Sequence, residues 1–113
     1  MLNQQPVLDN MTNNLFNYKS ISNNEVKVVN LCDSECIGKT LSDGTLEIDI
    51  SDSYFGGQSI GKTEAIDLLN NSGILNLVGN RIVKLALELN LASIESVKEI
   101  DGISFLLIYK FTQ

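Results

Sequence analysis

The amino-acid sequence predicts an α+β fold, a single small domain with about five mostly antiparallel strands and two main helices packed on the sheet. Three observations indicate it. The length of 113 residues suits one domain with one core. Short apolar segments alternate with turn residues, which is typical of strands, and one longer segment repeats apolar residues at helical spacing. Residues 1–12 are polar and aperiodic, so we expect a flexible N-terminal tail before one domain over residues 13–113.

The first fifty residues favour three strands. Apolar residues in segments 15–21 and 26–31 predict an opening hairpin whose turn is formed by residues 22–24. Segment 46–50 alternates apolar and acidic residues, as a strand with one solvent-exposed face does.

A short helical turn is expected between these strands. Asp33 is a suitable N-cap for a turn over residues 34–37, and Gly38 is placed to end it. Cys36 would then face the interior as a small apolar side chain. Residues 51–61 lack periodicity and contain two adjacent glycines, which predicts a loop.

Two helices are predicted in the second half of the chain. Thr63 is expected to cap the first, which ends in the polar segment 71–73. Asn76 is expected to cap the second, whose apolar residues form one stripe as far as Leu89. Asn90 is a suitable left-handed terminator. The second helix should be the more deeply buried of the two.

A C-terminal hairpin completes the predicted domain. Residues 97–100 and 103–111 flank Asp101-Gly102, a dipeptide that strongly favours a two-residue hairpin turn. The last segment is apolar on both faces, which predicts a central place in the sheet.

The octet GGQSIGKT, residues 56–63, matches the phosphate-binding pattern GxxxxGK[ST]. A phosphate loop needs a strand that leads directly into its first glycine, whereas here residues 52–55 intervene after the predicted strand. No later apolar segment ends in an Asp that would hold magnesium. We therefore expect Gly56 and Gly57 to form a tight turn before a helix. Nucleotide binding through Lys62 of this loop is the alternative.

The composition restricts the chemistry. The chain has no histidine, which excludes Ser-His-Asp and Cys-His nucleophile systems. Cys32 and Cys36 alone fall short of the four ligands of a zinc site. The acidic residues between Asp43 and Asp52 lack the spacing of a calcium loop. We accordingly predict no catalytic residues, no metal and no cofactor.

Charge and hydropathy bear on partners and location. Lys and Arg total 8 against 14 Asp and Glu, which gives a net charge of −6, so contact with RNA needs a local basic patch. No apolar run reaches the roughly 18 residues of a membrane span, and the first residues show no secretory signal. These features predict a cytoplasmic protein without a membrane partner.

Three junctions combine glycine with a basic residue: Gly38-Lys39, Gly61-Lys62 and Gly79-Asn80-Arg81. Glycine lets a ligand approach the backbone closely, and a helix N-terminus adds partial positive charge. We hypothesise that Lys39, Arg81 and Lys62 converge on one surface that binds a phosphate or RNA. Gly79 and Asn76 would stand beside it at the start of the main helix. The alternative is that Gly79 serves close packing while Lys39 and Arg81 pair with surface carboxylates.

Several strings of the chain occur together in one known family. NLCDSECIGKTLSDGTLEI, YFGG, NLVGNRIVKLALE and IDGI follow one another over residues 30–103. They resemble the CD.E.LGK block, the FYGG-like loop and the NLVG.R.V block of a small archaeal family, Domain of Unknown Function 424. NLVG with the following arginine is the most specific part. The matching residues are Cys32, Asp33, Glu35, Gly38, Lys39, Gly44, Gly56, Gly57, Asn76, Leu77, Val78, Gly79, Arg81 and Val83, with Gly102 near the end.

Two departures from the family pattern concern function. The family's segment after FYGG is acidic, whereas this chain has SIGKT, so the phosphate-loop spelling is particular to this sequence. The family's closing block carries His-Ala where this chain has Phe105 and Leu106. Any family activity that uses this histidine as acid, base or ligand is therefore in doubt for this chain.

The resemblance implies an archaeal cytosolic protein associated with RNA, the ribosome or translation. Together with the residues, it favours a non-enzymatic binding or adaptor domain. Two alternatives stay open. One is a nucleotide-binding protein that uses residues 56–63, and the other is a protein–protein interaction subunit that docks a partner through an apolar edge or helix face. The sequence does not indicate an oligomeric state.

Overall fold

The computed structural model describes residues 15–110, and its fold is α+β as predicted. One six-stranded sheet contains, in spatial order, β5 (Gln58–Ile60), β1 (Phe16–Asn23), β2 (Val26–Asp33), β6 (Ile74–Val78), β8 (Ile103–Tyr109) and β7 (Lys98–Ile100). Neighbouring strands are antiparallel except β2 and β6, which are parallel. The described strands outnumber the five expected. The predicted tail, residues 1–12, lies outside the described residues.

The opening hairpin is confirmed. β1 and β2 pair from Phe16 opposite Asp33 to Asn23 opposite Val26. The two turn residues between them, at positions 24 and 25, have φ values of 52° and 71°. Two consecutive positive φ angles are the geometry of a two-residue hairpin turn. β1 therefore extends into the segment expected to be the turn.

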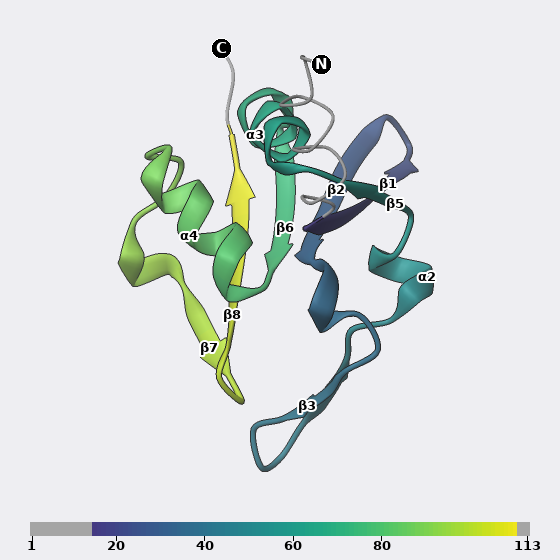
Figure 1. The fold of residues 1–113 in the computed structure, drawn as a ribbon, viewed down its shortest axis with the longest axis vertical. Helices are drawn as coiled ribbons and strands as arrows, with labels where there is room; N and C mark the ends of the chain where they lie inside the picture. The colour runs from purple at the N-terminus through teal and green to yellow at the C-terminus, as the bar shows by residue number, and fades with distance from the viewer. Residues whose placement is uncertain (1–14, 111–113) are drawn as a thin grey trace, which may run out of the picture.

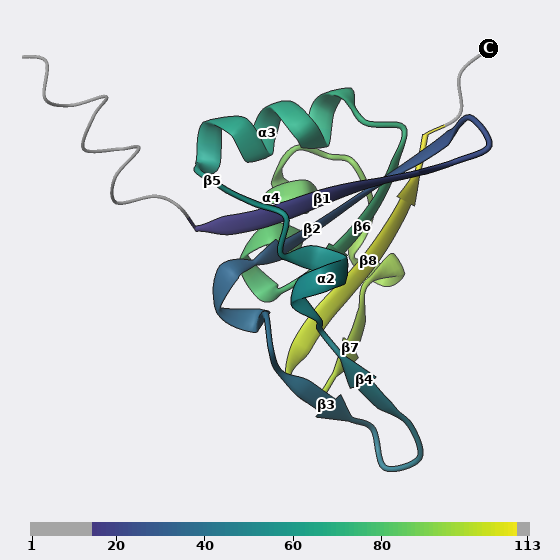
Figure 2. The same cartoon turned by 90° about the vertical axis from the view of Figure 1, so that its right-hand side faces the viewer.

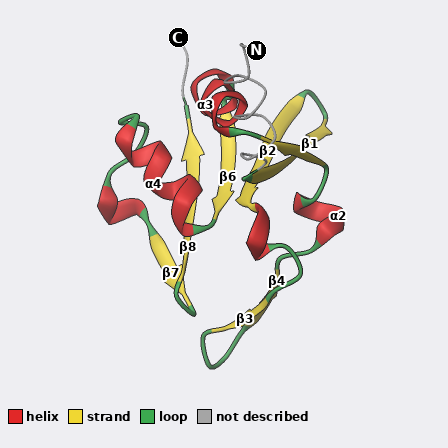
Figure 3. Cartoon of the chain, viewed as in Figure 1, coloured by secondary structure: helices red, strands yellow, loops and turns green. Residues whose placement is uncertain are grey.

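The segment between β2 and α3 is more ordered than predicted. A separate hairpin, β3 (Thr40–Ser42) and β4 (Glu47–Asp49), extends away from the six-stranded sheet (Figures 1 and 3). The expected loop over residues 51–61 contains a short helix, α2 (Asp52–Phe55), and the edge strand β5. Ser51 begins α2 by accepting a hydrogen bond from N of Tyr54. Pairing with β1 holds β5 extended.

Helix α3 (Lys62–Asn71) is one of the two predicted main helices, but it starts two residues earlier than a cap at Thr63 would place it. Gly61 is its N-cap residue, with an extended backbone, and Thr63 lies inside the first turn. Glu64 supplies the local contact here, since its Oε1 lies 3.4 Å from N of Gly61.

Helix α4 (Asn80–Glu88) is the second main helix, and the prediction that Asn76 caps it is wrong. Residues 74–78 form β6, which lies between β2 and β8. The apolar alternation of this short strand runs directly into the apolar stripe of the helix, so helical spacing alone does not separate them. At the other end, Asn90 has a φ of 61° and follows the helix as predicted.

The C-terminal hairpin is confirmed. Asp101 and Gly102 have φ values of 54° and 82° and join β7 to β8. β8 pairs with β6 on one side and β7 on the other, so it is internal, one strand from the sheet edge. Burial of both of its faces, however, is not observed. Leu107 and Tyr109 are 57% and 58% exposed.

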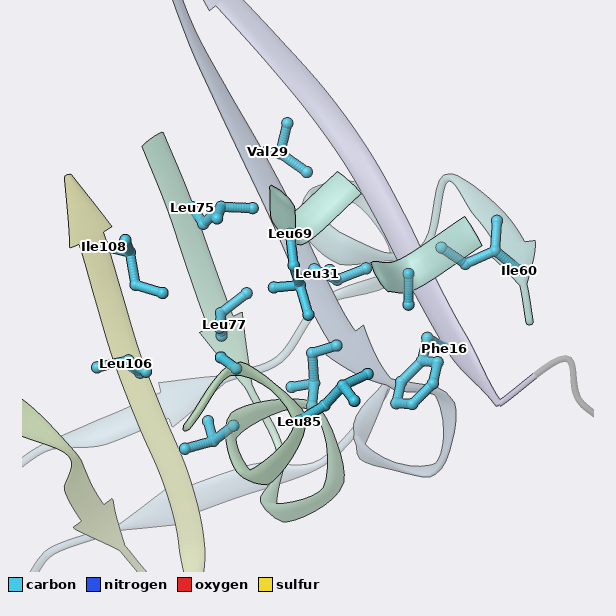
Figure 4. Close-up of a cluster of buried hydrophobic side chains, with 14 residues drawn as sticks. Phe16, Val29, Leu31, Ile60, Leu69, Leu75, Leu77, Leu85, Leu106 and Ile108 are labelled. Atoms are coloured by element: carbon cyan, nitrogen blue, oxygen red, sulfur yellow. The ribbon is translucent and has the colours of Figure 1, made fainter. Parts of the chain in front are cut away.

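The two faces of the sheet differ in how they are covered. Helices α3 and α4 lie on one side of the strands, and α2 with the β3–β4 hairpin lies on the other (Figure 2). The main core fills the first side (Figure 4); its labelled side chains are Phe16, Val29, Leu31, Ile60, Leu69, Leu75, Leu77, Leu85, Leu106 and Ile108. A smaller cluster under the hairpin includes Cys32, Cys36, Leu41, Ile50, Phe55 and Val78. Between residues 15 and 110, no helix has the length and apolar character needed to cross a membrane.

Candidate functional site

Asp33, the last residue of β2, holds the start of α4. Its carboxylate accepts hydrogen bonds from the backbone N–H groups of Arg81 and Ile82, each at 2.9 Å. The short 3-10 helix over Ser34–Cys36 receives no side-chain cap from Asp33, so the predicted capping chemistry is right but its target is wrong. The physical reason is that β2 ends beside the N-terminus of α4, whose unpaired N–H groups require acceptors.

Gly79 makes this contact possible. Its φ is +127°, a conformation that residues with a side chain rarely adopt. A Cβ at this position would lie 2.4 Å from Cγ of Asp33. The backbone of Gly79 also accepts from N of Val83 and donates to the carbonyl of Ser104 at 2.8 Å. Gly79 is therefore a close-packed glycine, which is the alternative stated for it in the sequence analysis.

The guanidinium of Arg81 is engaged on several sides. It donates to both carboxylate oxygens of Glu35, from Nε at 3.1 Å and from Nη2 at 2.5 Å, and Nη2 also reaches the carbonyl of Leu15 at 2.9 Å. Its Cζ lies 5.0 Å from the ring centroid of Phe16. The Arg81 side chain is still 38% exposed. We call the set Asp33, Glu35, Gly79 and Arg81 the α4 lock.

Burial and ion pairing shift the pKa values of the two carboxyl groups in the α4 lock in opposite directions. Burial raises the pKa of Asp33, while the N–H donors of α4 and the Arg81 guanidinium act to lower it. The hydrogen bonds from Arg81 lower the pKa of Glu35. Burial also raises the pKa of Cys32 to about 12, so this thiol is protonated at neutral pH. Within the described part of the chain, no group of three or more Cys, Asp or Glu is placed to hold a metal ion.

A pocket of about 270 Å³ lies next to the α4 lock. It is lined by Leu15, Phe16, Lys62, Arg81, Lys84, Leu85 and Glu88. We call it the basic pocket, because three cations and one carboxylate line it. Lys62 comes from the first turn of α3, and the other charged residues come from α4. Its remaining lining residues are apolar.

The structure brings together part of the hypothesised anion surface. Lys62 and Arg81 share the basic pocket, whereas Lys39 does not line it. Gly38 has a φ of +92° and ends the short helical turn as predicted. The carbonyl of the next residue, Lys39, accepts a hydrogen bond from N of Ile50 at the base of the β3–β4 hairpin. Asn76 lies in β6 and donates to Asn30 on β2 at 3.3 Å, outside the pocket.

Lys84 is the pocket residue that the sequence analysis missed. Lys84 stands in the middle of a helix and belongs to none of the glycine–basic junctions of the sequence. A usable signal was present in the spacing: Arg81, Lys84, Leu85 and Glu88 follow at intervals that place them on one face of α4.

The octet at residues 56–63 does not have the geometry of a phosphate loop. Helix α2, and not a strand, leads into Gly56, and three of the octet's residues form β5 in antiparallel pairing with β1. A Cβ on Gly57 would lie 2.2 Å from the carbonyl oxygen of Tyr18, and one on Gly56 would meet Asp52 at 2.0 Å. These two glycines permit close backbone packing.

Comparison with known proteins identifies the family. The family model described as "Protein of unknown function (DUF424)" matches residues 20–111. The chain belongs to the DUF424 family. Four of the residues that carry the DUF424 pattern in this chain, Asp33, Glu35, Gly79 and Arg81, are the four members of the α4 lock. The pattern thus corresponds in part to contacts that join β2, the 3-10 helix and α4.

A solved structure shares the DUF424 chain's fold. It is the crystal structure of an uncharacterized conserved protein from Methanopyrus kandleri, with a TM-score of 0.67 and 16% sequence identity. The similarity covers 87% of this chain and 95% of that chain. At this level of identity the likeness concerns the fold alone. No curated protein matches the sequence.

Proposed function

We propose that this chain is a non-enzymatic binding or adaptor domain, and that its ligand is RNA or another phosphate-bearing molecule held at the basic pocket. One observation carries the proposal: Lys62, Lys84 and Arg81, from two helices, line one pocket whose other lining is largely apolar. Phosphates are bound by convergent cations, and an apolar lining adds contact area for the group that carries the phosphate.

The two lysines are the cations available to a ligand. Both ion pairs found among residues 15–110 use Arg81, and neither Lys62 nor Lys84 has a carboxylate within pairing distance there. Arg81 is committed to Glu35 and to the carbonyl of Leu15. We therefore assign the binding role to the lysines and a supporting role to Arg81.

The lining favours binding over catalysis. Among the described residues that line it, none is a Ser, Thr or Cys that could act as a nucleophile, and Glu88 is the one carboxylate. A nucleophile with an adjacent base is the usual signature of covalent catalysis. The volume of about 270 Å³ is just under the range of sites for drug-sized ligands. It suits one phosphorylated group, such as a terminal nucleotide of an RNA.

The overall charge restricts the mode of binding. A net charge of −6 repels a long polyanion, so recognition should be local and involve few phosphates. Neutralising one or two phosphates of a single strand gives a salt slope of about −0.7 to −1.4 in log affinity against log salt. A steeper slope would indicate a larger basic surface than this pocket.

The test is binding of a short, fluorescently labelled, 5′-phosphorylated single-stranded RNA, followed by anisotropy. The Lys62→Ala/Lys84→Ala variant should bind at least about tenfold more weakly, since a hydrogen bond to a charged group is worth about 1.5–3 kcal/mol. The matched control is Lys27→Ala/Lys98→Ala, which removes two exposed lysines that do not line the pocket. The assignment to the pocket fails if both variants bind as the wild type does, and the assignment of RNA as the ligand fails if the wild type binds no RNA.

The second part of the proposal is that the chain associates with the ribosome or with the translation machinery, and it has its own test. The chain should copurify from its native source with ribosomal or translation-associated components, and ribonuclease treatment should release them. Association that resists ribonuclease would favour the competing function, a protein–protein interaction subunit. The specific observation in favour of that competitor is the exposure of Leu107 and Tyr109 on the sheet.

A further inference from the structure

One part of the six-stranded sheet carries an apolar surface that its own helices leave open. Strand residues alternate between faces, and Val29 and Leu75 point into the core under α3 and α4. Their neighbours Val28 and Ile74 therefore point to the opposite side. The surface is made up of Ile21, Val26, Val28, Ile74, Leu107 and Tyr109, which we call the open patch.

The strand register makes this surface continuous. Ile21 is opposite Val28, and Ile74 is opposite Tyr109. Val28 and Ile74 directly precede the parallel pair of Val29 and Leu75, so they too are neighbours. One apolar residue from each of β1, β2, β6 and β8 thus forms a row across four adjacent strands.

The open patch is exposed, while the other end of the same face is covered. There, the hairpin and α2 pack on Cys32, Val78 and Phe105. On the open patch, Val26, Leu107 and Tyr109 are each at least half exposed, and the three remaining residues are less exposed. Of the six large apolar side chains that are highly exposed between residues 15 and 110, three therefore gather on this one surface.

The charge on this side of the sheet points to the kind of partner. Among the strand residues of the large sheet that face this side, Lys19 and Lys98 carry charge and none is acidic, although the chain has 14 Asp and Glu. Lys19 donates to the carbonyl of Ser53 at 2.7 Å. A strongly charged partner therefore has few charged side chains to pair with on this face. A second copy of the chain would present the same face, so carboxylates of the two copies would not meet across it.

We propose that the open patch is the interface of a symmetric dimer of this chain. Two copies would stack their sheets face to face, at the spacing of about 10 Å that packed sheets adopt. A two-fold interface is self-complementary and reuses the same apolar row on both subunits. The basic pocket lies on the side of α3 and α4, so both pockets of the dimer would face outward and remain accessible.

The apolar area of the open patch determines how tightly the dimer should associate. The six side chains expose on the order of 500 Å² of apolar surface, at the upper end of what a monomer usually shows in one patch. A standard interface buries about 800 Å² per partner, so polar residues at the rim must contribute as well. The expected dimer is therefore dissociable, with a dissociation constant in the micromolar range.

Sedimentation velocity of the full chain over a range of micromolar concentrations tests this. The wild type should shift from monomer to dimer as concentration rises. Leu107→Ser/Tyr109→Ser should weaken the dimer at least about a hundredfold, as the loss of central apolar contacts does. The matched control is Leu46→Ser/Ile94→Ser, whose residues are 58% and 66% exposed elsewhere on the molecule. The control should dimerise as the wild type does.

The proposal is overturned if the wild type stays monomeric at every concentration, or if the two variants dimerise equally well. A second measurement covers misfolding of the Leu107→Ser/Tyr109→Ser variant. Methyl NMR signals of Ile74 and Val28 in the wild type should shift with concentration while those of Ile94 should not, and invariance of all three would also overturn the dimer. RNA binding by the pocket is measured independently, so either proposal can fail alone.

Discussion

Helices α3 and α4 begin alike in the sequence and differently in the structure. Each follows a glycine and has a basic residue in its first turn. At α4, a buried carboxylate from β2 binds two backbone N–H groups, and Glu35 binds the arginine. At α3, the N–H of Gly61 instead donates a long hydrogen bond of 3.4 Å to the helix's own Glu64.

The difference shows that the tertiary partner decides the role of a glycine–basic pair. Gly79 and Arg81 meet residues from β2 and the 3-10 helix, so both are committed to holding elements together. Lys62 meets no such partner among the described residues and faces a pocket. Similar short sequence motifs therefore form a structural contact at the start of α4 and leave a cation available for a ligand at the start of α3.

The largest effect should come from placing a side chain at each helix-start glycine. Gly79→Ala forces a strained φ and a 2.4 Å contact with Asp33, so we expect it to lower the free energy of unfolding by about 3 kcal/mol or more. Gly61 has a φ of −94°, which any residue adopts, so Gly61→Ala should cost less than about 1 kcal/mol. Urea denaturation measures both. Equal losses of unfolding free energy in the two variants would show that the starts of α3 and α4 do not differ in this way.

Removing the carboxylate at the α4 start should have the next largest effect. Asp33→Ala deletes the acceptor of two backbone N–H groups, one of which belongs to a fully buried residue, so we expect a loss of about 2 kcal/mol or more. Asp33→Asn keeps one oxygen acceptor and should lose about half as much. Thermal unfolding followed by circular dichroism distinguishes the two. An alanine variant as stable as the wild type would mean that Asp33 does not hold α4.

The pairing of Glu35 with Arg81 should appear as a pH-dependent effect. Because the pKa of Glu35 is lowered in the folded state, its ionisation stabilises the fold above its ordinary pKa of 4.5, and this stabilisation is lost as the pH falls. Glu35 is exposed, so we expect less than about 1 kcal/mol. Glu35→Gln should be less stable than the wild type at pH 7 and equally stable once Glu35 is protonated. A stability difference that is independent of pH would contradict the ion pair.

The local patterns of the sequence were sufficient for the two hairpins and the two helix bodies. Asp101-Gly102 requires a specific turn geometry, and the apolar stripe of α4 requires a buried helix face. Both patterns lie within a few neighbouring residues, so they can be recognised in the sequence without knowledge of the fold. The buried position of Cys36 follows for the same reason.

What the sequence did not reveal depends on contacts between distant residues. β6 became a strand through parallel pairing with β2, which is more than forty positions away in the chain. The partner of Asp33 lies about fifty positions along, so local capping rules pointed to the wrong helix. The basic pocket forms only when α3 and α4 are placed on the same side of the sheet, which brings Lys62 and Lys84 to one lining.

Parallel urea unfolding of Arg81→Ala and Lys62→Ala tests whether Arg81 holds the fold together while Lys62 is left for a ligand. Arg81→Ala should lose about 2 kcal/mol of unfolding free energy, because the Glu35 pair, the bond to Leu15 and the contact with the Phe16 ring are lost together. Lys62→Ala should stay within about 0.5 kcal/mol of the wild type, as surface substitutions do. Equal stabilities for the two variants would contradict the assignment of Arg81 to structure and Lys62 to ligand binding.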